Sequence, residues 1–330
     1  VPQKGYDFHT IKVAGFRRSL SPKAIIHNIS AVKLAATSMM SAKKIIKKIN
    51  PDVVVGTGGY VSGPVLKAAQ KLGIKTAIHE QNAFPGVTTK MLAPNADRVM
   101  LAMPQAKKYL KLNKEPIVTG NPIRKEIVPA TAQMKEEACA FYGLDPEKKH
   151  LLIVGGSLGS GTLNNSMKKW IEDGCPGGEG IEVIWQCGKY YKPSVDAFMN
   201  EAKEKGTEGL QNIQYSDFIK RMDLAYAAAD VIISRSGASS ISEMCAAHKA
   251  CIFVPSPNVT EDHQTHNAMA LVRKDAGMIV TDAEAGEKLM KTACELIENK
   301  EKIALMEKNI AALAKTDAAM TIAEEVYKYV

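Results

Sequence analysis

The feature that most limits the fold is a strand, a glycine-containing turn and a helix that occur in both halves of the chain. "DVVVGTGGYVSGPVLKAAQKLGIKTAIHE" begins at Asp52, and "DVIISRSGASSISEMCAAHKACIFVP" begins at Asp230. Each stretch contains an aspartate, a β-branched strand, a turn of small residues, a helix and a second strand. Such alternation is typical of doubly wound domains, whose ligands bind at the carboxyl ends of parallel strands. The repeat predicts two α/β domains, each with a glycine turn at that edge of its sheet.

The alternation of apolar runs and helical patterns places the remaining elements. We predict strands over 53–55, 76–79, 98–101 and 116–119, and then over 151–154, 182–186, 213–215, 231–234, 251–254 and 277–280, with a helix over 65–72 after the first glycine turn. "GNPIRKEIVP" (120–129) is the predicted linker between domains at 1–123 and 124–316. The amphipathic end of the chain, 317–330, could pack back on the first domain.

Composition and charge narrow the class of protein. The chain of 330 residues is long enough for two domains, and no apolar run reaches the roughly 18 residues that a membrane-spanning helix needs. Its cysteines are scattered without a C-x-x-C pair, which favours a reducing compartment and argues against a zinc site.

Residues 1–50 hold ten Lys and Arg against one acid, and this basic block contains "VAGFRRSLSPKAIIHNI". Basic and apolar residues mixed in this way indicate an anionic membrane surface. The alternative is a solvated helix face, as in "SAKKIIKKIN", whose isoleucines face the core.

Two glycine-rich turns can present backbone amides to a phosphate. The first, from Gly56 to Gly63, matches neither the dinucleotide nor the P-loop spacing. The second follows a strand in "LLIVGGSLGSGTLNNSMKKW", where Ser157 adds a hydroxyl donor. The same residues satisfy G-x-S-x-G, the nucleophile elbow of α/β hydrolases. Under that alternative Ser157 would be a nucleophile, and its triad partners would be Asp230 or Asp262 and His263 or His266.

Other polar stretches also follow predicted strands. Glu243 in "SRSGASSISEM" could accept both hydroxyls of a ribose, or could be a surface glutamate of an amphipathic helix. His79 ends a strand in "IHEQNAFPG" and is either a base or a structural residue. His263 and His266 lack a third metal ligand nearby, so we expect no metal site. The chain contains no D-x-D pair, so a bound diphosphate would depend on amides, helix dipoles and an arginine such as Arg124.

Six motifs occur in a fixed order: "GTGGYVSGP", "IHEQNAFPG", "GNPIR", "GGSLGS", "RSGASSISE" and "DHQTHNA". Together they closely resemble the MurG-type glycosyltransferases of bacterial cell-wall synthesis, from about Val1 to the C-terminus. The resemblance implies a GT-B fold, with two Rossmann-like domains facing a cleft, the acceptor domain first and the UDP-sugar donor domain second. It implies an inverting transfer of N-acetylglucosamine from UDP-N-acetylglucosamine to lipid I, giving lipid II for peptidoglycan. It further implies a peripheral protein on the cytoplasmic face of the plasma membrane, with no cofactor, metal or nucleic acid.

The resemblance also implies site residues wherever the motifs match. It places Ile219 beside the uracil and Glu243 on the ribose, and it assigns Gln264 and Asn82 to the donor sugar. The other donor contacts that it implies are Arg124, Ser157, Ala238, Ser239, Ser240, Ile241 and Ser242. The residues expected at the acceptor diphosphate are Gly56, Gly58, Gly59 and Ser62. Those expected at the membrane are Phe16, Arg17, Arg18, Leu20, Lys23, Ile25 and Ile26.

One departure from the family pattern affects the first domain. The family begins with a strand and a glycine loop, G-G-T-G-G-H, whose histidine is the favoured general base or acceptor-binding group. This chain begins at "VPQKGYDF" without that loop. We therefore expect a truncated first domain and assign no general base, with His79 as a weak substitute. Two alternatives stay open: a catalytically impaired UDP-sugar-binding fragment of the enzyme, and a UDP-sugar epimerase of the same fold.

Overall fold

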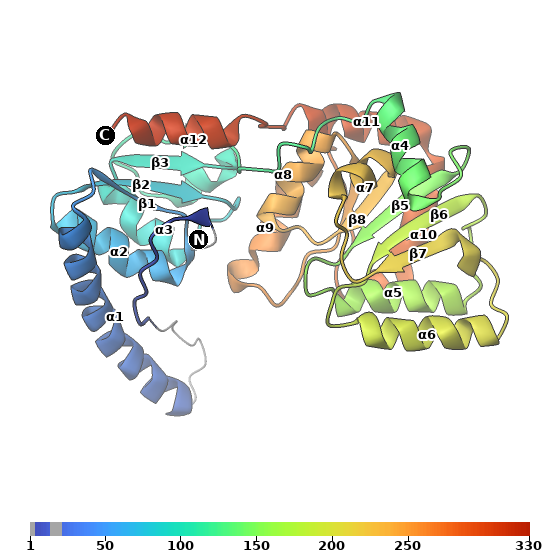
Figure 1. Ribbon diagram of the computed structural model, residues 1–330, viewed down its shortest axis with the longest axis horizontal. Coiled ribbons are helices and arrows are strands. Elements are labelled where there is room, and N and C mark those ends of the chain that lie inside the picture. Colours follow the sequence, from blue (N-terminus) through green and yellow to red (C-terminus); the bar gives the residue numbers. More distant parts are fainter. Residues whose placement is uncertain (1–3, 14–21) are drawn as a thin grey trace. The chain divides into compact units, whose positions relative to one another are not determined.

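The computed structural model describes residues 4–13 and 22–330, with side chains of the first helix described at Leu34 and from Thr37 onward. The chain forms two compact units (Figure 1). Unit 1 comprises Val1–Gly120 and Asp317–Val330, and unit 2 comprises Asn121–Thr316. The division therefore falls at 120/121, slightly before the 123/124 boundary predicted from the sequence.

The described part of unit 1 contains a parallel sheet in the order β1-β2-β3-β4. Its strands are β1 (Val53–Gly56), β2 (Lys75–Glu80), β3 (Arg98–Leu101) and β4 (Ile117–Val118). Its helices are α1 (Pro22–Ile49), α2 (Gly59–Lys71), α3 (Val87–Leu92) and α12 (Ala318–Tyr327), with short 3-10 helices at Ala93–Asn95 and Pro104–Tyr109.

Apolar contacts hold these elements together. Ala42 and Ile46 of α1 are buried with Ala68 and Ala69 of α2, whereas the neighbouring Ile49 is 54% exposed. The lysines around Ile46 (Lys44, Lys47 and Lys48) face solvent, so this end of α1 follows the core-facing alternative for "SAKKIIKKIN". The predicted start of the helix after β1 is wrong: α2 begins at Gly59 and continues through Pro64. Gly63 is buried within that helix, and a Cβ there would make only an ordinary contact with Thr88, 3.5 Å from its Cγ2.

The last helix of the chain belongs to unit 1. Arg98 at the start of β3 pairs with the buried Glu325 of α12 at 2.6 Å, and the Tyr329 hydroxyl donates to the Asp97 carbonyl at 3.0 Å. These contacts join residues more than two hundred positions apart and fix α12 against β3.

The described part of unit 2 contains a six-stranded parallel sheet in the order β10-β9-β8-β5-β6-β7. Its strands are β5 (Lys149–Val154), β6 (Ile181–Gln186), β7 (Ile213–Ser216), β8 (Val231–Ser234), β9 (Ala250–Phe253) and β10 (Met278–Ile279). Its helices are α4 (Ala132–Tyr142), α5 (Gly161–Glu172), α6 (Lys192–Glu204), α7 (Met222–Ala228), α8 (Ala238–Ala247), α9 (His263–Val272), α10 (Ala285–Glu298) and α11 (Lys300–Ala311), with 3-10 helices at Leu210–Asn212 and Thr260–Asp262.

Helices cover both faces of this sheet, with α5 and α6 on one side and α4 and α8 on the other (Figure 1). The side chains of Leu151, Ile153 and Trp185 point to the first face, where α5, α6 and α10 complete a fully buried core. Strands buried on both faces are what a doubly wound sheet requires.

No helix in the described parts of the chain combines the length and apolar character needed to span a bilayer.

Candidate functional site

The strand order of unit 2 places its glycine turn at a point where the chain changes direction across the sheet. From β5 the chain proceeds outward through β6 and β7, then returns to the other side of β5 to form β8. Val154 and Ser234, the last residues of β5 and β8, are partners in the sheet. The helices that follow these two strands, α5 and α8, therefore both begin at this carboxyl edge, on opposite faces of the sheet (Figure 1). In open α/β sheets a ligand binds at such a switch point.

The turn before α5 is shaped by close backbone approaches. A Cβ on Gly159, whose φ is +88°, would lie 2.2 Å from the Cys187 carbonyl oxygen. Ser160 caps the helix by accepting the amide of Leu163 at 3.3 Å. The Ser157 side chain is exposed at the tip. The turn therefore combines a helix N-terminus with an exposed hydroxyl, the arrangement expected for a phosphate.

The turn before α8 also leads into a helix N-terminus. Gly237 precedes the helix without a side-chain cap, so the amides of Ala238, Ser239 and Ser240 are the orphan donors of the first turn. Two predicted contacts in this turn are not supported by the geometry. The Ile241 side chain is buried in the core and its amide donates to the Gly237 carbonyl, while the Ser242 hydroxyl is engaged by Ala238 and Asn121.

The predicted linker is anchored to this turn. Asn121 is buried, and its side-chain amide donates to the Ala238 carbonyl at 3.3 Å and to the Ser242 hydroxyl at 3.0 Å. Three residues further on, Arg124 makes a two-pronged ion pair with Glu243, through Nε to Oε1 at 2.8 Å and a terminal nitrogen to Oε2 at 2.6 Å. The hydrogen bond to Glu243 raises the pKa of Arg124. The structure thus brings together the predicted phosphate arginine and the predicted ribose carboxylate.

Glu243 accepts hydrogen bonds from a second residue besides the partly exposed Arg124. The Tyr226 hydroxyl also donates to Glu243 Oε2 at 3.3 Å, and burial raises the pKa of Tyr226, so this phenol stays protonated. The Glu243 side chain is only 12% exposed. A carboxylate held by two donors is pre-oriented to accept further hydroxyls, which favours a binding role over a solvated surface position.

Two other predicted donor residues are differently oriented. Ile219 is only 5% exposed, so its side chain belongs to the buried core. Gln264 accepts the Ser256 amide through Oε1 at 2.9 Å. Its Nε2 has no protein acceptor in the described part of the chain. Gln264 is therefore oriented to donate.

In unit 1, His79 has a structural environment. It is 3% exposed, its Nε2 lies 2.8 Å from the Gly120 carbonyl oxygen, and its Nδ1 lies 3.1 Å from Gln81 Nε2. The Gly120 carbonyl oxygen can only accept, so His79 Nε2 carries the proton. Gln81 Nε2 is a donor, so the lone pair of His79 Nδ1 accepts from it. Burial lowers the pKa of His79. This imidazole is neutral and engaged at both nitrogens, which argues against the general-base role.

Asn82 lies in the loop that follows β2. The buried carboxylate of Glu80 accepts the Asn82 amide at 3.1 Å, its side-chain nitrogen at 3.3 Å and the Thr89 hydroxyl at 2.6 Å. Glu80 therefore holds this loop in one conformation, and Asn82 with it.

The glycine turn of unit 1 is more open than that of unit 2. Gly58 (φ +84°) and Gly59 (φ +74°) adopt left-handed conformations before α2, and Gly58 provides no side-chain cap. Gly56 approaches α2 so closely that a Cβ would lie 2.3 Å from Leu66 Cδ1. The Ser62 hydroxyl donates back to the Gly59 carbonyl at 2.9 Å. These features leave the first amides of α2 without a side-chain cap, as an anion site in this turn would require.

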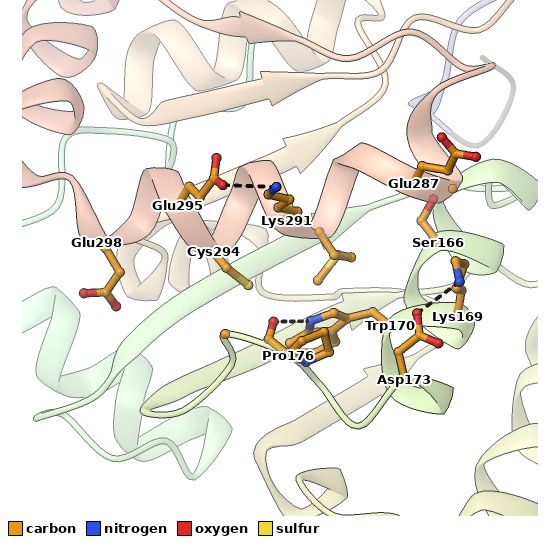
Figure 2. Close-up of a pocket in the computed structure, with 13 residues that line it drawn as sticks. Ser166, Lys169, Trp170, Asp173, Pro176, Glu287, Lys291, Cys294, Glu295 and Glu298 are labelled. Carbon is orange, nitrogen blue, oxygen red and sulfur yellow. Dashed lines mark hydrogen bonds and ion pairs between the residues drawn. The ribbon is translucent and has the colours of Figure 1, made fainter.

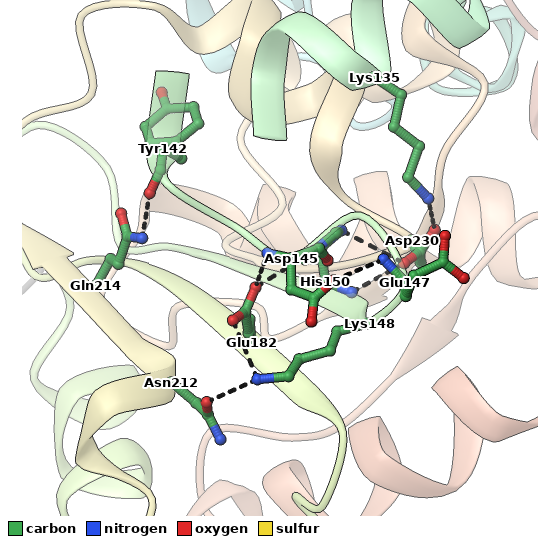
Figure 3. Close-up of polar contacts among 10 residues, drawn as sticks. All are labelled: Lys135, Tyr142, Asp145, Glu147, Lys148, His150, Glu182, Asn212, Gln214 and Asp230. Carbon is green, nitrogen blue, oxygen red and sulfur yellow. Dashed lines mark hydrogen bonds and ion pairs between the residues drawn. The ribbon is translucent and has the colours of Figure 1, made fainter. Parts of the chain in front are cut away.

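The hydrolase alternative is not supported by the geometry. Asp230 precedes β8 at the amino edge of the sheet, where it accepts the His150 amide and pairs with Lys135, both at 2.8 Å (Figure 3). Ser157 follows β5 at the opposite edge, a full strand length away. Asp262 accepts the Thr265 hydroxyl, and His263 contacts the Thr260 carbonyl. Among the hydrogen bonds of the described residues, none joins Ser157 to a histidine.

The predicted site contains no candidate metal cluster among the described residues, and the cavity in Figure 2 lies elsewhere. The described residues contain no group of three or more His, Cys, Asp or Glu placed to hold a metal ion. The cavity, of about 780 Å³, lies between α5 and α10 beside Trp170 and Cys294. Trp170 belongs to the last turns of α5, so this cavity is at the other end of that helix from the glycine turn.

The predicted membrane residues largely fall outside what the structure describes. Phe16, Arg17, Arg18 and Leu20 are not among the described residues. Lys23, Ile25 and Ile26 lie on the described backbone of α1, but their side chains are not described.

Comparison with known proteins agrees with this geometry. The glycosyltransferase family 28 N-terminal domain matches residues 1–101, and the corresponding C-terminal domain matches residues 150–322. The UDP-N-acetylglucosamine–N-acetylmuramyl-(pentapeptide) pyrophosphoryl-undecaprenol N-acetylglucosamine transferase of Bacteroides fragilis is 45% identical over 328 residues, which are 99% of this chain and 83% of that protein. The chain belongs to this glycosyltransferase family. The transferase of the same name from Parabacteroides distasonis is 41% identical over 330 residues, covering 100% of this chain and 86% of the relative.

Solved structures confirm the predicted GT-B fold. The crystal structure of Acinetobacter baumannii MurG matches with a TM-score of 0.76 and 26% identity, over 99% of this chain and 86% of that one. A putative UDP-N-acetylglucosamine 2-epimerase from Listeria monocytogenes matches with a TM-score of 0.61 over 88% of this chain and 77% of its own. At 15% identity the epimerase shares the fold alone, whereas the sequence relatives are transferases.

Two residues of the site were missed in the sequence. Arg235 follows β8, and its guanidinium contacts Asp282 at 2.5 Å, the Val254 carbonyl at 3.0 Å and Thr162 of α5 at 3.2 Å. It therefore joins the start of α5 to the ends of β8 and β9. Gln186, the last residue of β6, donates to two loop carbonyls. A polar side chain at the end of a buried strand was the available signal for both.

Proposed function

We propose that this chain transfers N-acetylglucosamine from UDP-N-acetylglucosamine to lipid I, the undecaprenyl-linked N-acetylmuramyl-pentapeptide, to form lipid II. The observation that carries the proposal is the pair of helix N-termini, α5 and α8, that begin after the adjacent strands β5 and β8. The names of the relatives supply the sugar and the acceptor. The proposed setting is the cytoplasmic face of the bacterial plasma membrane, with the protein bound peripherally.

In this proposal unit 2 binds the nucleotide. The amides of the α5 turn and the Ser157 hydroxyl hold the diphosphate, the α8 turn contributes the amides of Ala238–Ser240, and Glu243 accepts the ribose hydroxyls. The backbone at Ile219 meets the uracil, and Gln264 donates to the sugar. Asn82 of unit 1 is the further proposed sugar contact.

The proposed chemistry is a direct displacement that inverts the anomeric carbon. The acceptor hydroxyl attacks that carbon as UDP leaves, and the hydroxyl proton passes to a base that we do not assign. Charge developing on UDP is stabilised by backbone amides, the α5 dipole and Arg124, groups fixed before the reaction begins. The two-pronged ion pair with Glu243 holds the Arg124 guanidinium in place, so its positive charge is among these fixed groups.

The acceptor side of the proposal rests on unit 1. The amides after Gly58 and Gly59 suit the lipid diphosphate, and the basic N-terminal block suits an anionic lipid surface. We propose no resident cofactor or metal, because the groups named above meet the donor's charge.

The test is incubation of the chain with labelled UDP-N-acetylglucosamine and lipid I, followed by separation of lipid products. The proposal predicts labelled lipid II and equimolar UDP. Epimerised donor formed without acceptor would favour the epimerase alternative. Donor binding without turnover would favour the impaired-fragment alternative, and neither outcome is compatible with the proposal.

A further inference from the structure

Gln186 lies at the carboxyl edge of the unit 2 sheet, on the strand next to the edge strand β7. It is the last residue of β6, between β5 and β7, and is 3% exposed. Its carbonyl accepts the Gly155 amide at 3.3 Å, and the following amide, of Cys187, donates to the Ser216 carbonyl at 2.9 Å. These bonds continue both sheet ladders just past the ends of the strands.

The Gln186 side chain extends this connection by one residue on each side. Its Nε2 donates to the Gly156 carbonyl and to the Asp217 carbonyl, both at 2.8 Å. Gly156 immediately precedes Ser157 of the diphosphate turn, and Asp217 lies two residues before Ile219 of the uracil turn. One NH₂ group therefore joins the two turns through the residues that lead into them.

The orientation of this amide is determined by its neighbours. Two carbonyl oxygens face it, so the nitrogen must point to them. In the described part of the chain the buried Oε1 has no hydrogen-bond partner. An unpaired buried acceptor is unfavourable. Any favourable contribution of this side chain to the fold therefore comes from the two hydrogen bonds that Nε2 donates.

We propose that Gln186 is a positioning residue that sets the spacing between the diphosphate turn and the uracil turn of the donor site. The inference rests on the proposed UDP-sugar donor. β5 and β7 both pair with β6 and not with each other, so beyond the strand ends the side chain from β6 links their turns. A ligand that reaches both turns benefits from this spacing, because the turns need no reordering when it binds. A ligand that reaches one turn does not.

The test compares UDP with uridine by titration against the wild type and Gln186→Met, which keeps the side-chain length and removes both donors. UDP affinity is expected to fall about three- to tenfold, the effect of one net hydrogen bond, while uridine affinity stays close to wild type. In the transfer reaction KM for UDP-N-acetylglucosamine should rise with kcat unchanged, as for an interaction made equally before and during the reaction.

The matched control is Gln70→Met in unit 1. The Nε2 of Gln70 donates to one carbonyl, of Leu92 at 3.1 Å, and its buried Oε1 has no partner among the described residues. This variant should lose stability and keep UDP affinity. If Gln186→Met does not fold, Gln186→His replaces it in the test, because histidine keeps one N–H donor. Its affinity for UDP should fall by a smaller factor, and its affinity for uridine should stay close to wild type.

The inference is overturned if UDP affinity is unchanged in a folded Gln186 variant, or if uridine affinity falls by the same factor. A wild type that binds no UDP would remove the donor site and this inference together. A wild type that binds UDP but forms no lipid II would contradict the proposed transfer and leave the role of Gln186 standing.

Discussion

The glycine turns before α5 and α2 each join a strand to a helix, but neighbouring elements support them differently. The turn before α5 follows a central strand, is capped by Ser160 and packs against the β6–α6 loop at Gly188. The turn before α2 follows β1, which lies at the edge of the sheet in the described residues, with Val55 42% exposed. It has no side-chain cap, and Tyr60 and Val61 of its helix face solvent. The comparison teaches that two glycine turns of the same strand–turn–helix type need not be equally preorganised: neighbouring elements fix the turn before α5, whereas local glycines shape the turn before α2.

The largest expected difference comes from adding one methyl group to each turn. Gly159→Ala combines a left-handed φ with a Cβ at 2.2 Å from a backbone oxygen, and should lower the free energy of unfolding by about 3 kcal/mol or more. Gly59→Ala meets no atom within 4 Å, and should cost only the left-handed strain of about 1–2 kcal/mol. Urea unfolding measures both. Tryptophan fluorescence reports unit 2, which holds both tryptophans, and circular dichroism reports the whole chain. Equal losses in the free energy of unfolding for the two variants would contradict the proposed difference between the turns.

A second prediction concerns ligand affinity. Glu243→Gln removes the carboxylate that Arg124 and Tyr226 orient, and should weaken UDP-N-acetylglucosamine binding roughly 10- to 100-fold, the range for a hydrogen bond to a charged group. Calorimetric titration measures the change. The control is Glu201→Gln on the exposed face of α6, where the glutamate pairs with Lys205. Unchanged affinity in Glu243→Gln would remove this residue from the site.

Some features of the fold and the site could be predicted from the sequence, and others could not. The strands at 98–101 and 231–234 were predicted with their observed bounds, since β-branched and apolar runs ended by polar residues define them locally. The start of α2 was missed because four glycines close together indicate a turn, whereas Gly59 and Gly63 lie within the helix. The pairing of Arg124 with Glu243 could not be predicted, because it joins positions 119 apart. Gln186 ends a buried strand, but its role could not be predicted because its two acceptors are loop carbonyls whose positions depend on the fold.

A third prediction tests the helix caps. Ser160→Ala removes the acceptor for the Leu163 amide, and should cost about 1 kcal/mol of stability. Ser62→Ala is the counterpart in the first turn of α2, where the hydroxyl donates backward to Gly59 and caps no amide. Its effect should be smaller. Fluorescence and circular dichroism unfolding curves compare the two, and a larger loss for Ser62→Ala would reverse the proposed difference in support.

A fourth prediction concerns pH and unit 1. Burial lowers the pKa of His79 below its ordinary value of 6.5, with nearby Glu80 opposing the shift. The unfolded chain therefore binds the proton more readily, and the His79 contribution to stability is present above pH 6.5 and is lost as pH falls below it. His79→Gln should show a shallower loss of stability than the wild type between pH 7.5 and 5.5, measured by hydrogen exchange of β2 amides. Parallel curves would show that His79 does not titrate on unfolding.

The central claim is that the donor binds at the paired helix starts of unit 2. The most direct measurement is the backbone amide spectrum of the isotope-labelled chain during titration with UDP-N-acetylglucosamine. We predict saturable shifts of the amides of Gly156–Ser160 and Ala238–Ser240, with little change at Gly58–Ser62. Shifts confined to the unit 1 turn, or no shifts while unit 2 is folded, would contradict the account.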